Sequence, residues 1–399
     1  MAARERRGGG IVKRKREDVI TLDDSLWERV MAATDGAVAP CYQCGVCTAA
    51  CPWGLLQEEP VNVRSLMRRA QLGVHQDGEM WWCTTCRACE EQCPRGVPIA
   101  DVMLALRRLA WQDRTIPEGI SPVMWALYWD GNPWRRPPSQ RAVWARGVNI
   151  KRFQPSDEIL FYVGCTPSYD NRSQKVARAL AGIFGTAGVS FGTLGDDEPC
   201  CGDAAYALGQ QDYMQQIVQK NAERFVEEGV QRVVTVSPHC QDMFLNQYPP
   251  IEGFQPLHYT QYLAQLIQDG RLGFEAEYPV KATFHDPCYL GRRNGVYDPP
   301  RDVLAAIPGL ELVEMPQSRA EALCCGGGGG RMWMDTKAGE RFSDLRVREA
   351  LDTGAEVLVT ACPHCIACLE DSLKQTGSPM RVMDVAEVVA GALSAGGGA

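Results

Sequence analysis

The residues of this sequence that could do chemistry are its 18 cysteines. No apolar run of about 18 residues occurs, and Arg6 and Arg7 are followed by glycines and a basic stretch, so neither a spanning helix nor an export signal is visible. We therefore expect a cytoplasmic chain, in which thiols are held reduced and structural disulfides are rare. The cysteines are then predicted to be metal ligands or redox groups.

Two cysteine runs near the N-terminus share one spacing, C-x2-C-x2-C-x3-C-P. They read CYQCGVCTAACP from Cys41 and CTTCRACEEQCP from Cys83. This is the spacing of bacterial 4Fe-4S ferredoxins, in which the fourth cysteine of each run ligates the other cluster. We therefore expect two cubane 4Fe-4S clusters, one on Cys41, Cys44, Cys47 and Cys93 and the other on Cys83, Cys86, Cys89 and Cys51. Zinc fits poorly, because its four-ligand sets lack the Cys-Pro ending.

The C-terminal half contains the same pattern of cysteines twice. VTVSPHC ends at Cys240 and VTACPHC ends at Cys365, and matching cysteines are 123 to 125 residues apart, which indicates an internal repeat. The first copy holds Cys165, Cys200, Cys201, Ser237 and Cys240, and the second holds Cys288, Cys324, Cys325, Cys362 and Cys365. The second copy therefore has five thiols, one more than a cubane needs.

The paired cysteines and the run CCGGGGG favour a large cluster in the second copy. Two adjacent thiolates cannot both reach one small ion without strain, but they can flank a larger cluster. Glycine backbone can approach sulfide closely and donate its N–H groups to sulfur. A thioredoxin-type dithiol at CPHC and a zinc site remain alternatives. A nucleotide-binding loop is excluded, because the run lacks the residues that complete either phosphate motif.

Short β-branched runs alternate with helical periods from Asp157 onward, as in βα units with parallel strands. The predicted fold is an all-helical two-cluster ferredoxin module followed by two tandem α/β Cys-Cys-Gly repeats with mainly parallel sheets. A linker with four tryptophans joins them, and we expect these to pack between domains or to contact a partner. The predicted parts are a disordered basic tail (1–21), the helical module (22–115), the linker (116–155), the first repeat (156–275), the second repeat (276–393) and a flexible tail (394–399).

This arrangement resembles the family of the heterodisulfide reductase D subunits and the DsrK proteins. The resemblance covers about residues 38 to 390, and GNPW, HDPC, CCG and CPHC occur in the order found in the family. It implies that a complete motif binds a noncubane 4Fe-4S cluster at which a disulfide is cleaved in two one-electron steps. It also implies that this catalytic cluster is held by the second-copy residues, Cys288, Cys324, Cys325, Cys362 and Cys365.

The first copy departs from the family pattern, because Ser237 replaces the leading cysteine of its last pair. Its four thiols, Cys165, Cys200, Cys201 and Cys240, with His239 nearby, suit zinc or an ordinary cluster. We favour a structural or degenerate metal site there over a second catalytic cluster or no metal. His285 and His364 flank the second site, as proton donors or as turn caps. Arg292, Arg293 and Arg331 would give its pocket positive charge or form surface ion pairs.

The resemblance leads to two functional hypotheses. The first is an oxidoreductase that reduces or forms a disulfide, heterodisulfide or protein trisulfide, with electrons passing through the two cubanes to the noncubane site. The second is an electron-transfer subunit of a flavin dehydrogenase of the glycerol-3-phosphate, glycolate or lactate type that feeds quinone. No flavin or nicotinamide motif is present, so both need a partner, a membrane cytochrome b or other quinone-linked subunit or a flavoprotein. The expected substrate is a sulfur-carrying small molecule or a protein thiol.

The net charge of the chain limits the ligands it can bind, and the expected partner indicates where the chain lies in the cell. A net charge of -8 argues against nucleic-acid binding. We expect the chain to lie on the inner face of the membrane, held there by a partner subunit.

Overall fold

Helices and tight turns build the part of the chain that carries the first eight cysteines. The computed structural model describes residues 24–56, 61–74, 78–148, 150–336 and 339–396, and within these residues the module before position 116 has no strand. The predicted disordered tail, residues 1–21, lies outside the described residues. The elements of the module are α1 (Asp24–Ala33), α2 (Val46–Ala50), α3 (Trp53–Leu56), α4 (Val63–Gln71), η2 (Glu79–Trp82), α5 (Ala88–Glu91) and α6 (Ile99–Gln112).

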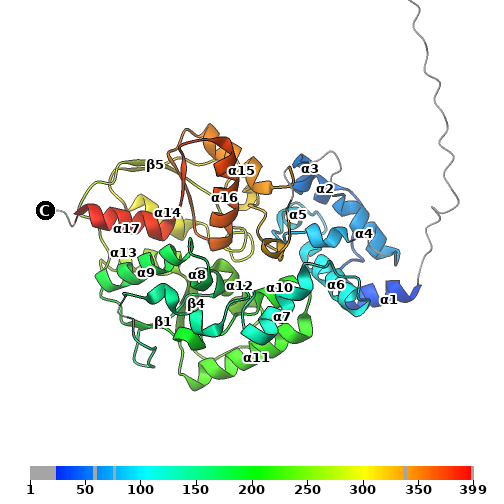
Figure 1. Cartoon of the computed structure of the whole chain (residues 1–399). Coiled ribbons are helices and arrows are strands. Elements are labelled where there is room, and N and C mark those ends of the chain that lie inside the picture. Colours follow the sequence, from blue (N-terminus) through cyan, green and yellow to red (C-terminus); the bar gives the residue numbers. More distant parts are fainter. Residues whose placement is uncertain (1–23, 57–60, 75–77, 149, 337–338, 397–399) are drawn as a thin grey trace, which may run out of the picture.

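Helix α6 forms the centre of this module. Its apolar residues recur every three or four positions, as in Val102, Leu106 and Leu109, and these are buried, which is the pattern of a core-facing helix. Helices α1 and η2 pack against it, and the whole module lies at one end of the molecule in blue and cyan (Figure 1). None of the described helices is long and apolar enough to cross a membrane.

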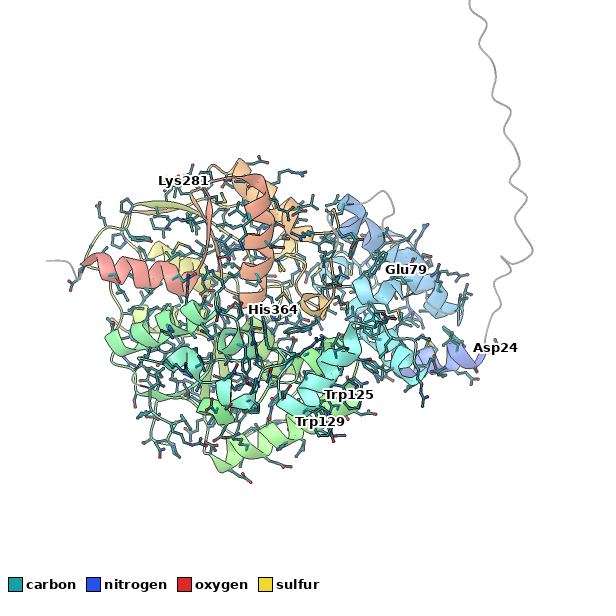
Figure 2. The ribbon with its side chains drawn as sticks, viewed as in Figure 1. Asp24, Glu79, Trp125, Trp129, Lys281 and His364 are labelled. Atoms are coloured by element: carbon teal, nitrogen blue, oxygen red, sulfur yellow. The ribbon has the colours of Figure 1, made fainter. Side chains whose placement is uncertain are left out.

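The linker is ordered and its four tryptophans divide into two pairs. It contains α7 (Ile120–Asp130) and the short turns η3 (Pro138–Gln140) and η4 (Val143–Ala145). Trp144 is buried edge-on against Phe161 of the first repeat, and Trp134 meets Trp333 of the second repeat edge-on at 5.3 Å between ring centroids. Trp125 and Trp129 on α7 are instead 61% and 73% exposed (Figure 2). Interdomain packing therefore accounts for one pair only.

Each repeat is a four-stranded parallel sheet, ordered β2-β1-β3-β4 in the first and β6-β5-β7-β8 in the second. The first repeat runs β1 (Ile159–Tyr162), α8 (Cys165–Tyr169), α9 (Gln174–Thr186), β2 (Phe191–Gly192), η5 (Gly195–Asp197), α10 (Asp203–Ala207), α11 (Gln211–Glu227), β3 (Arg232–Thr235), α12 (Pro238–Asn246), β4 (Gln255–His258) and α13 (Tyr259–Gln268). The second runs β5 (Val280–Phe284), α14 (Asp298–Ala305), β6 (Leu310–Leu312), η6 (Arg319–Glu321), η7 (Arg331–Trp333), α15 (Phe342–Asp352), β7 (Val357–Thr360), α16 (Pro363–Thr376), β8 (Arg381–Asp384) and α17 (Val385–Gly396).

The central strands explain why the sheets are parallel and enclosed. Strands β1 (ILFY) and β7 (VLVT) are buried at every position, so both faces must be covered by helices, as in α/β domains. Strand β1 pairs with β2 and β3, and β5 pairs with β6 and β7, always in parallel. The predicted fold class is therefore confirmed.

The two repeats pack against each other in an approximately symmetrical way. Helix α9 contacts α17, and the corresponding pair α13 and α14 also pack together, so the four helices lie side by side at the end opposite the cysteine module (Figure 1). Arg172, which precedes α9, reinforces this contact through ion pairs with Glu370 at 2.5 Å and Glu387 at 2.8 Å. The two cysteine sites are consequently held in one rigid arrangement.

The predicted flexible tail from Ser394 begins too early. Helix α17 continues through Gly396, and the Ser394 hydroxyl donates to the carbonyl oxygen of Ala390 at 2.8 Å. Leu393 and Ala395, which flank Ser394, are good helix formers and let the last turn form despite the glycines that follow. Residues 397–399 lie outside the described part of the chain.

Candidate functional site

The two N-terminal cysteine runs share an unusual backbone conformation. Gln43 and Gly45 in the first run, and Thr85 and Arg87 in the second, all have positive φ angles, between 53° and 87°. Non-glycine residues rarely adopt such angles, and a β-branched threonine does so least of all. The turn aims the backbone N–H of Thr85 at the sulfur of Cys83, 3.4 Å away. Strain of this kind persists where a loop is shaped around a ligand, and N–H groups aimed at sulfur suit a cluster-binding loop.

The four cysteines assigned to one cubane lie around a single small apolar cavity. Cys51 comes from the first run and Cys83, Cys86 and Cys89 from the second, and Met103 of α6 is among the residues that line the cavity with them. Burial raises the pKa of Cys83 to about 11, and burial and the Cys86 thiolate raise the pKa of Cys51 further. Thiols this crowded and buried lose their protons only when a multiply charged cation balances the thiolates, which fits an iron–sulfur cluster.

The four cysteines assigned to the other cubane lie closer to the surface. Cys44 is exposed, and the Cys47 thiol lies near those of Cys41 and Cys44. Helices α2 and α5, which carry the third cysteine of each run, pack against each other and place the two runs side by side. The Cys93 sulfur accepts a hydrogen bond from the backbone N–H of Val97 at 3.4 Å.

The five cysteines of the second repeat are buried together at the carboxyl ends of its strands. They follow β5, β6 and β7, and the strand order reverses between β5 and β7, which is where ligands bind in such sheets. Side-chain contacts link the thiols in a chain, from Cys288 to Cys324, Cys325, Cys365 and Cys362. The structure therefore brings together all five residues that the sequence assigns to this site.

The glycine run after Cys325 has a second role that the sequence did not reveal. The N–H of Gly326 donates to the Cys324 sulfur at 3.3 Å, as expected. A Cβ atom at Gly328 would lie 2.5 Å from the carbonyl oxygen of Thr84, and one at Gly329 would lie 2.4 Å from that of Cys83. These glycines let the backbone of the second repeat contact the backbone of the second cysteine run.

The ferredoxin module and the five-cysteine site meet directly. The Cys86 thiol contacts that of Cys324, and the Cys324 sulfur lies 3.5 Å from the Thr84 hydroxyl. Arg292, expected to line a charged pocket, instead donates to the carbonyl oxygen of Cys86 at 2.8 Å. Arg293 pairs with the buried Asp242 at 2.9 Å, whereas carbonyl oxygens hold Arg292 in place and leave its positive charge beside the second site.

In the first repeat the four predicted thiols also share one cavity. It is lined by Cys165, Cys200, Cys201 and Cys240 together with Ser237 and both PHC histidines. Arg141 donates to the Cys165 sulfur at 3.5 Å and pairs with Glu198 at 3.0 Å. The Ser237 hydroxyl accepts the backbone N–H of His239 at 3.3 Å and caps α12, whereas Cys362 at the same position of α16 makes no such bond. The serine therefore serves as a helix cap.

The histidines of the two PHC turns meet at the interface between the repeats, with 4.3 Å between ring centroids. His364, predicted to flank the second site, lies 3.2 Å from the Thr166 hydroxyl in the first repeat. His239 lies 3.3 Å from Asp203, and although burial opposes it, Asp203 and the Cys362 thiolate raise the pKa of His239 to about 10. Burial also opposes ionisation of Cys362, but hydrogen bonds from Cys365 and His239 hold the pKa of Cys362 well below its usual value. His364 therefore lies beside Cys362 and also reaches Thr166 across the repeat interface.

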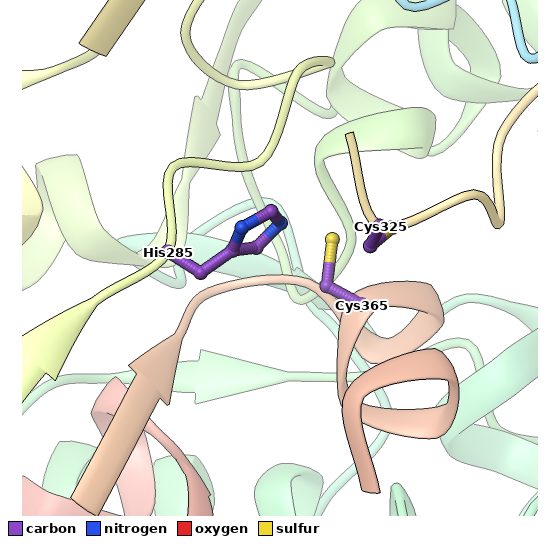
Figure 3. Close-up of side chains that lie close together, drawn as sticks. All are labelled: His285, Cys325 and Cys365. Carbon is purple, nitrogen blue, oxygen red and sulfur yellow. The ribbon is translucent and has the colours of Figure 1, made fainter. Parts of the chain in front are cut away.

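His285 does lie at the second site, as predicted. Burial, followed by the positive charges of Arg346 and Arg292, lowers its pKa well below the usual value, so the ring is neutral. One of its ring nitrogens and the sulfur atoms of Cys325 and Cys365 all lie within 4.8 Å of one another. Figure 3 shows the three side chains converging from β5, the glycine run and α16.

An open cavity of about 470 Å³ reaches the second site from the surface. Cys325, Gly326 and Gly327 lie among its lining residues, with Arg331 and Cys368 beside them. Cys368, which belongs to neither repeated cysteine motif, is only half-buried and lines this cavity. Its place one turn after Cys365 on α16 was the available signal.

The comparisons with known proteins follow this architecture. Residues 37–97 match the 4Fe-4S dicluster domain family, and residues 159–245 and 282–370 each match the cysteine-rich domain family. Over 321 residues the chain is 32% identical to the D subunit of the dihydromethanophenazine:CoB--CoM heterodisulfide reductase of Methanosarcina barkeri, and the match covers 78% of this chain and 77% of that protein. The chain belongs to the family of heterodisulfide reductase D subunits. The predicted family resemblance is thus confirmed.

Two relatives that are longer than this chain have names other than heterodisulfide reductase. The chain is 39% identical over 326 residues to the probable iron-sulfur-binding oxidoreductase FadF of Bacillus subtilis. It is 38% identical over 329 residues to the EtfAB:quinone oxidoreductase of Syntrophomonas wolfei. Each match covers 78% of this chain but 46% of the relative, so the chain spans about half the length of these two proteins. The family places the chain among iron–sulfur oxidoreductases.

Proposed function

We propose that the chain is the iron–sulfur subunit of an oxidoreductase that reduces or forms a disulfide-type bond at the five-cysteine site of the second repeat. The observation that carries the proposal is the contact between Cys86 and Cys324, because it joins the ferredoxin module to that site within one buried junction. Single electrons can then pass between the ferredoxin module and the five-cysteine site without crossing solvent. The open cavity at Cys325 supplies the access that a sulfur substrate needs.

The cysteine sets suit the cofactors that this reaction requires. Once bound, two cubane 4Fe-4S clusters and one noncubane 4Fe-4S cluster would supply its one-electron steps. The ferredoxin cysteines hold the first two in the crossed arrangement, and the apolar residues around Cys51 exclude water from one of them. Cys288, Cys324, Cys325, Cys362 and Cys365 hold the third. The first repeat, with four thiols and a serine cap, would hold zinc or a further iron–sulfur cluster in a structural role.

Residues of the chain also define what the substrate meets. A disulfide takes up two electrons and two protons and yields two thiols. Arg331 lines the cavity and is buried to more than nine-tenths, so it offers positive charge to an anionic thiol or disulfide. Arg172 and Arg341 line the same cavity, although both are paired with carboxylates.

The test is a stoichiometric assay on the anaerobically reconstituted chain. With reduced methyl viologen as donor and a panel of disulfides that includes the CoB–CoM heterodisulfide, we expect two dye molecules to be oxidised for every two thiols released. Cys362→Ser should abolish thiol release, and Cys368→Ser, on the same helix, should retain it. Absence of thiol release with every disulfide and with a protein trisulfide would refute the proposal.

A second candidate function is favoured by the two longer relatives. One of them, 38% identical to the chain, is named EtfAB:quinone oxidoreductase, and this name supports transfer of electrons between a flavoprotein and quinone. In that case the five-cysteine site passes electrons on and reacts with no sulfur substrate. Oxidation of a reduced electron-transferring flavoprotein by the chain, with a quinone analogue as acceptor and no disulfide, would select this function over the first.

A further inference from the structure

His285 is a buried histidine at the second-repeat site, and among the described residues only one of its two ring nitrogens has a hydrogen-bond partner. It directly follows β5 and is buried. The Nε of Arg346 donates to its Nδ1 at 3.1 Å. Because a guanidinium group has donors only, Nδ1 must be the acceptor, and the single hydrogen of the neutral ring then lies on Nε2.

Arg346 cannot easily turn away from this role. It is completely buried, and its Nη1 donates to the carbonyl oxygen of Gln317 at 2.6 Å and to the carboxylate of Glu349 at 2.7 Å. Its Nε is therefore fixed against the imidazole. The tautomer of His285 is set by this anchored neighbour, as in other sites where an outer residue orients a ligand-facing histidine.

The other side of the ring faces the cysteines. Nε2 is buried and has no hydrogen-bond partner among the described residues. Figure 3 shows this outer edge of the ring directed toward the sulfur of Cys365, with Cys325 next to it. A buried N–H group without a partner is rare in folded proteins, so this one points to an acceptor that the protein binds there.

We propose that His285 donates an Nε2–H hydrogen bond to the sulfur atoms of the iron–sulfur group held by Cys325 and Cys365, and that it is a positioning residue and not a ligand of iron. The inference rests on the proposed cluster at this site. Coordination by Nε2 would require the hydrogen on Nδ1, where it would face the Arg346 donor. The hydrogen bond withdraws negative charge from sulfur and so raises the reduction potential of the group.

The variants His285→Leu and His285→Gln test this against the wild type. We expect both to keep the iron content of the wild type. His285→Leu should lower the midpoint potential of the signal that Cys362→Ser removes. His285→Gln, whose amide can donate, should restore most of it.

A measurement on the unaltered chain decides between donor and ligand without any variant. Electron-nuclear double resonance of protein labelled with ¹⁵N-histidine should show a weakly coupled nitrogen and an exchangeable proton. A strongly coupled nitrogen, or loss of about four irons in both His285 variants, would overturn the proposal. So would an unchanged potential in His285→Leu. If the chain binds this cluster but reduces no disulfide, the proposed function fails and the inference on His285 stands.

Discussion

The guanidinium group of Arg107, on α6, donates a hydrogen bond of 2.7 Å to the carbonyl oxygen of Gly329 in the second repeat. The same side chain donates to the carbonyl oxygens of Met80, Cys83 and Ala207. It is completely buried and therefore joins the second cysteine run to both repeats at once. The junction between Cys86 and Cys324 lies in the part of the fold that this arginine holds together.

Replacing Arg107 should loosen that junction. Arg107→Met would leave four buried carbonyl groups without their donor, so we expect a loss of about 3 kcal/mol or more in the free energy of unfolding. Urea denaturation followed by tryptophan fluorescence measures this. Arg108→Met, at the neighbouring and less buried position of the same helix, is the control and should cost less than about 1 kcal/mol. Equal losses would contradict the role assigned to Arg107.

The cysteines of α16 allow a sharp test of the second-repeat site. Cys365 is buried among the other thiols, whereas Cys368, one turn later, lines the cavity. We expect Cys365→Ser to lose about four irons per chain and Cys368→Ser to lose none. Iron and sulfide analysis after anaerobic reconstitution provides the measurement. The assignment is wrong if the two variants retain the same iron.

Ser237 provides the reciprocal experiment in the first repeat. The variant Ser237→Cys would complete the five-thiol pattern beside Cys165, Cys200, Cys201 and Cys240, and we expect a gain of about four irons per chain. It should also cost about 1 kcal/mol of stability, because the serine cap of α12 is lost. Ser237→Ala controls for the cap alone. An unchanged iron content in Ser237→Cys would show that the serine does not decide what the first site binds.

Spacing along the sequence was enough to predict the fold class and to expect the cysteines of each repeat to lie together, because these depend on local periodicity and on strand ends that must meet at one edge of a sheet. The strained turn at Thr85 was not predictable, since its side chain argues against a positive φ. Nor was the contact between His239 and His364, which depends on how one repeat docks on the other. The contact of Gly329 with Cys83 was hidden for the same reason, because a glycine run does not indicate which surface it approaches.

The contribution of Asp384 to the free energy of unfolding should decrease as the pH rises through the range in which its carboxyl group titrates. Burial raises the pKa of Asp384 from 3.8 to about 8, and its carboxyl group accepts from Tyr259 and from the backbone of Ala386. The folded state therefore holds a proton that the unfolded state releases, so this contribution is complete below about pH 4 and is lost by about pH 8. In the variant Asp384→Asn the side chain is an amide, which stays neutral at every pH in this range. We expect its unfolding midpoint, relative to wild type, to rise between pH 5 and pH 8, and a constant difference would contradict the shift.

The tryptophans of the linker should differ strongly in what they contribute. Trp144 is buried against Phe161, and its truncation to alanine would leave a large cavity, so we expect a loss of about 3 to 5 kcal/mol. Trp129 is 73% exposed on α7, and Trp129→Ala should change the free energy of unfolding by less than about 0.5 kcal/mol. Chemical denaturation of both variants measures the difference. A large loss in Trp129→Ala would mean that its ring packs within the chain, whereas a small one leaves the exposed face of α7 dispensable for folding.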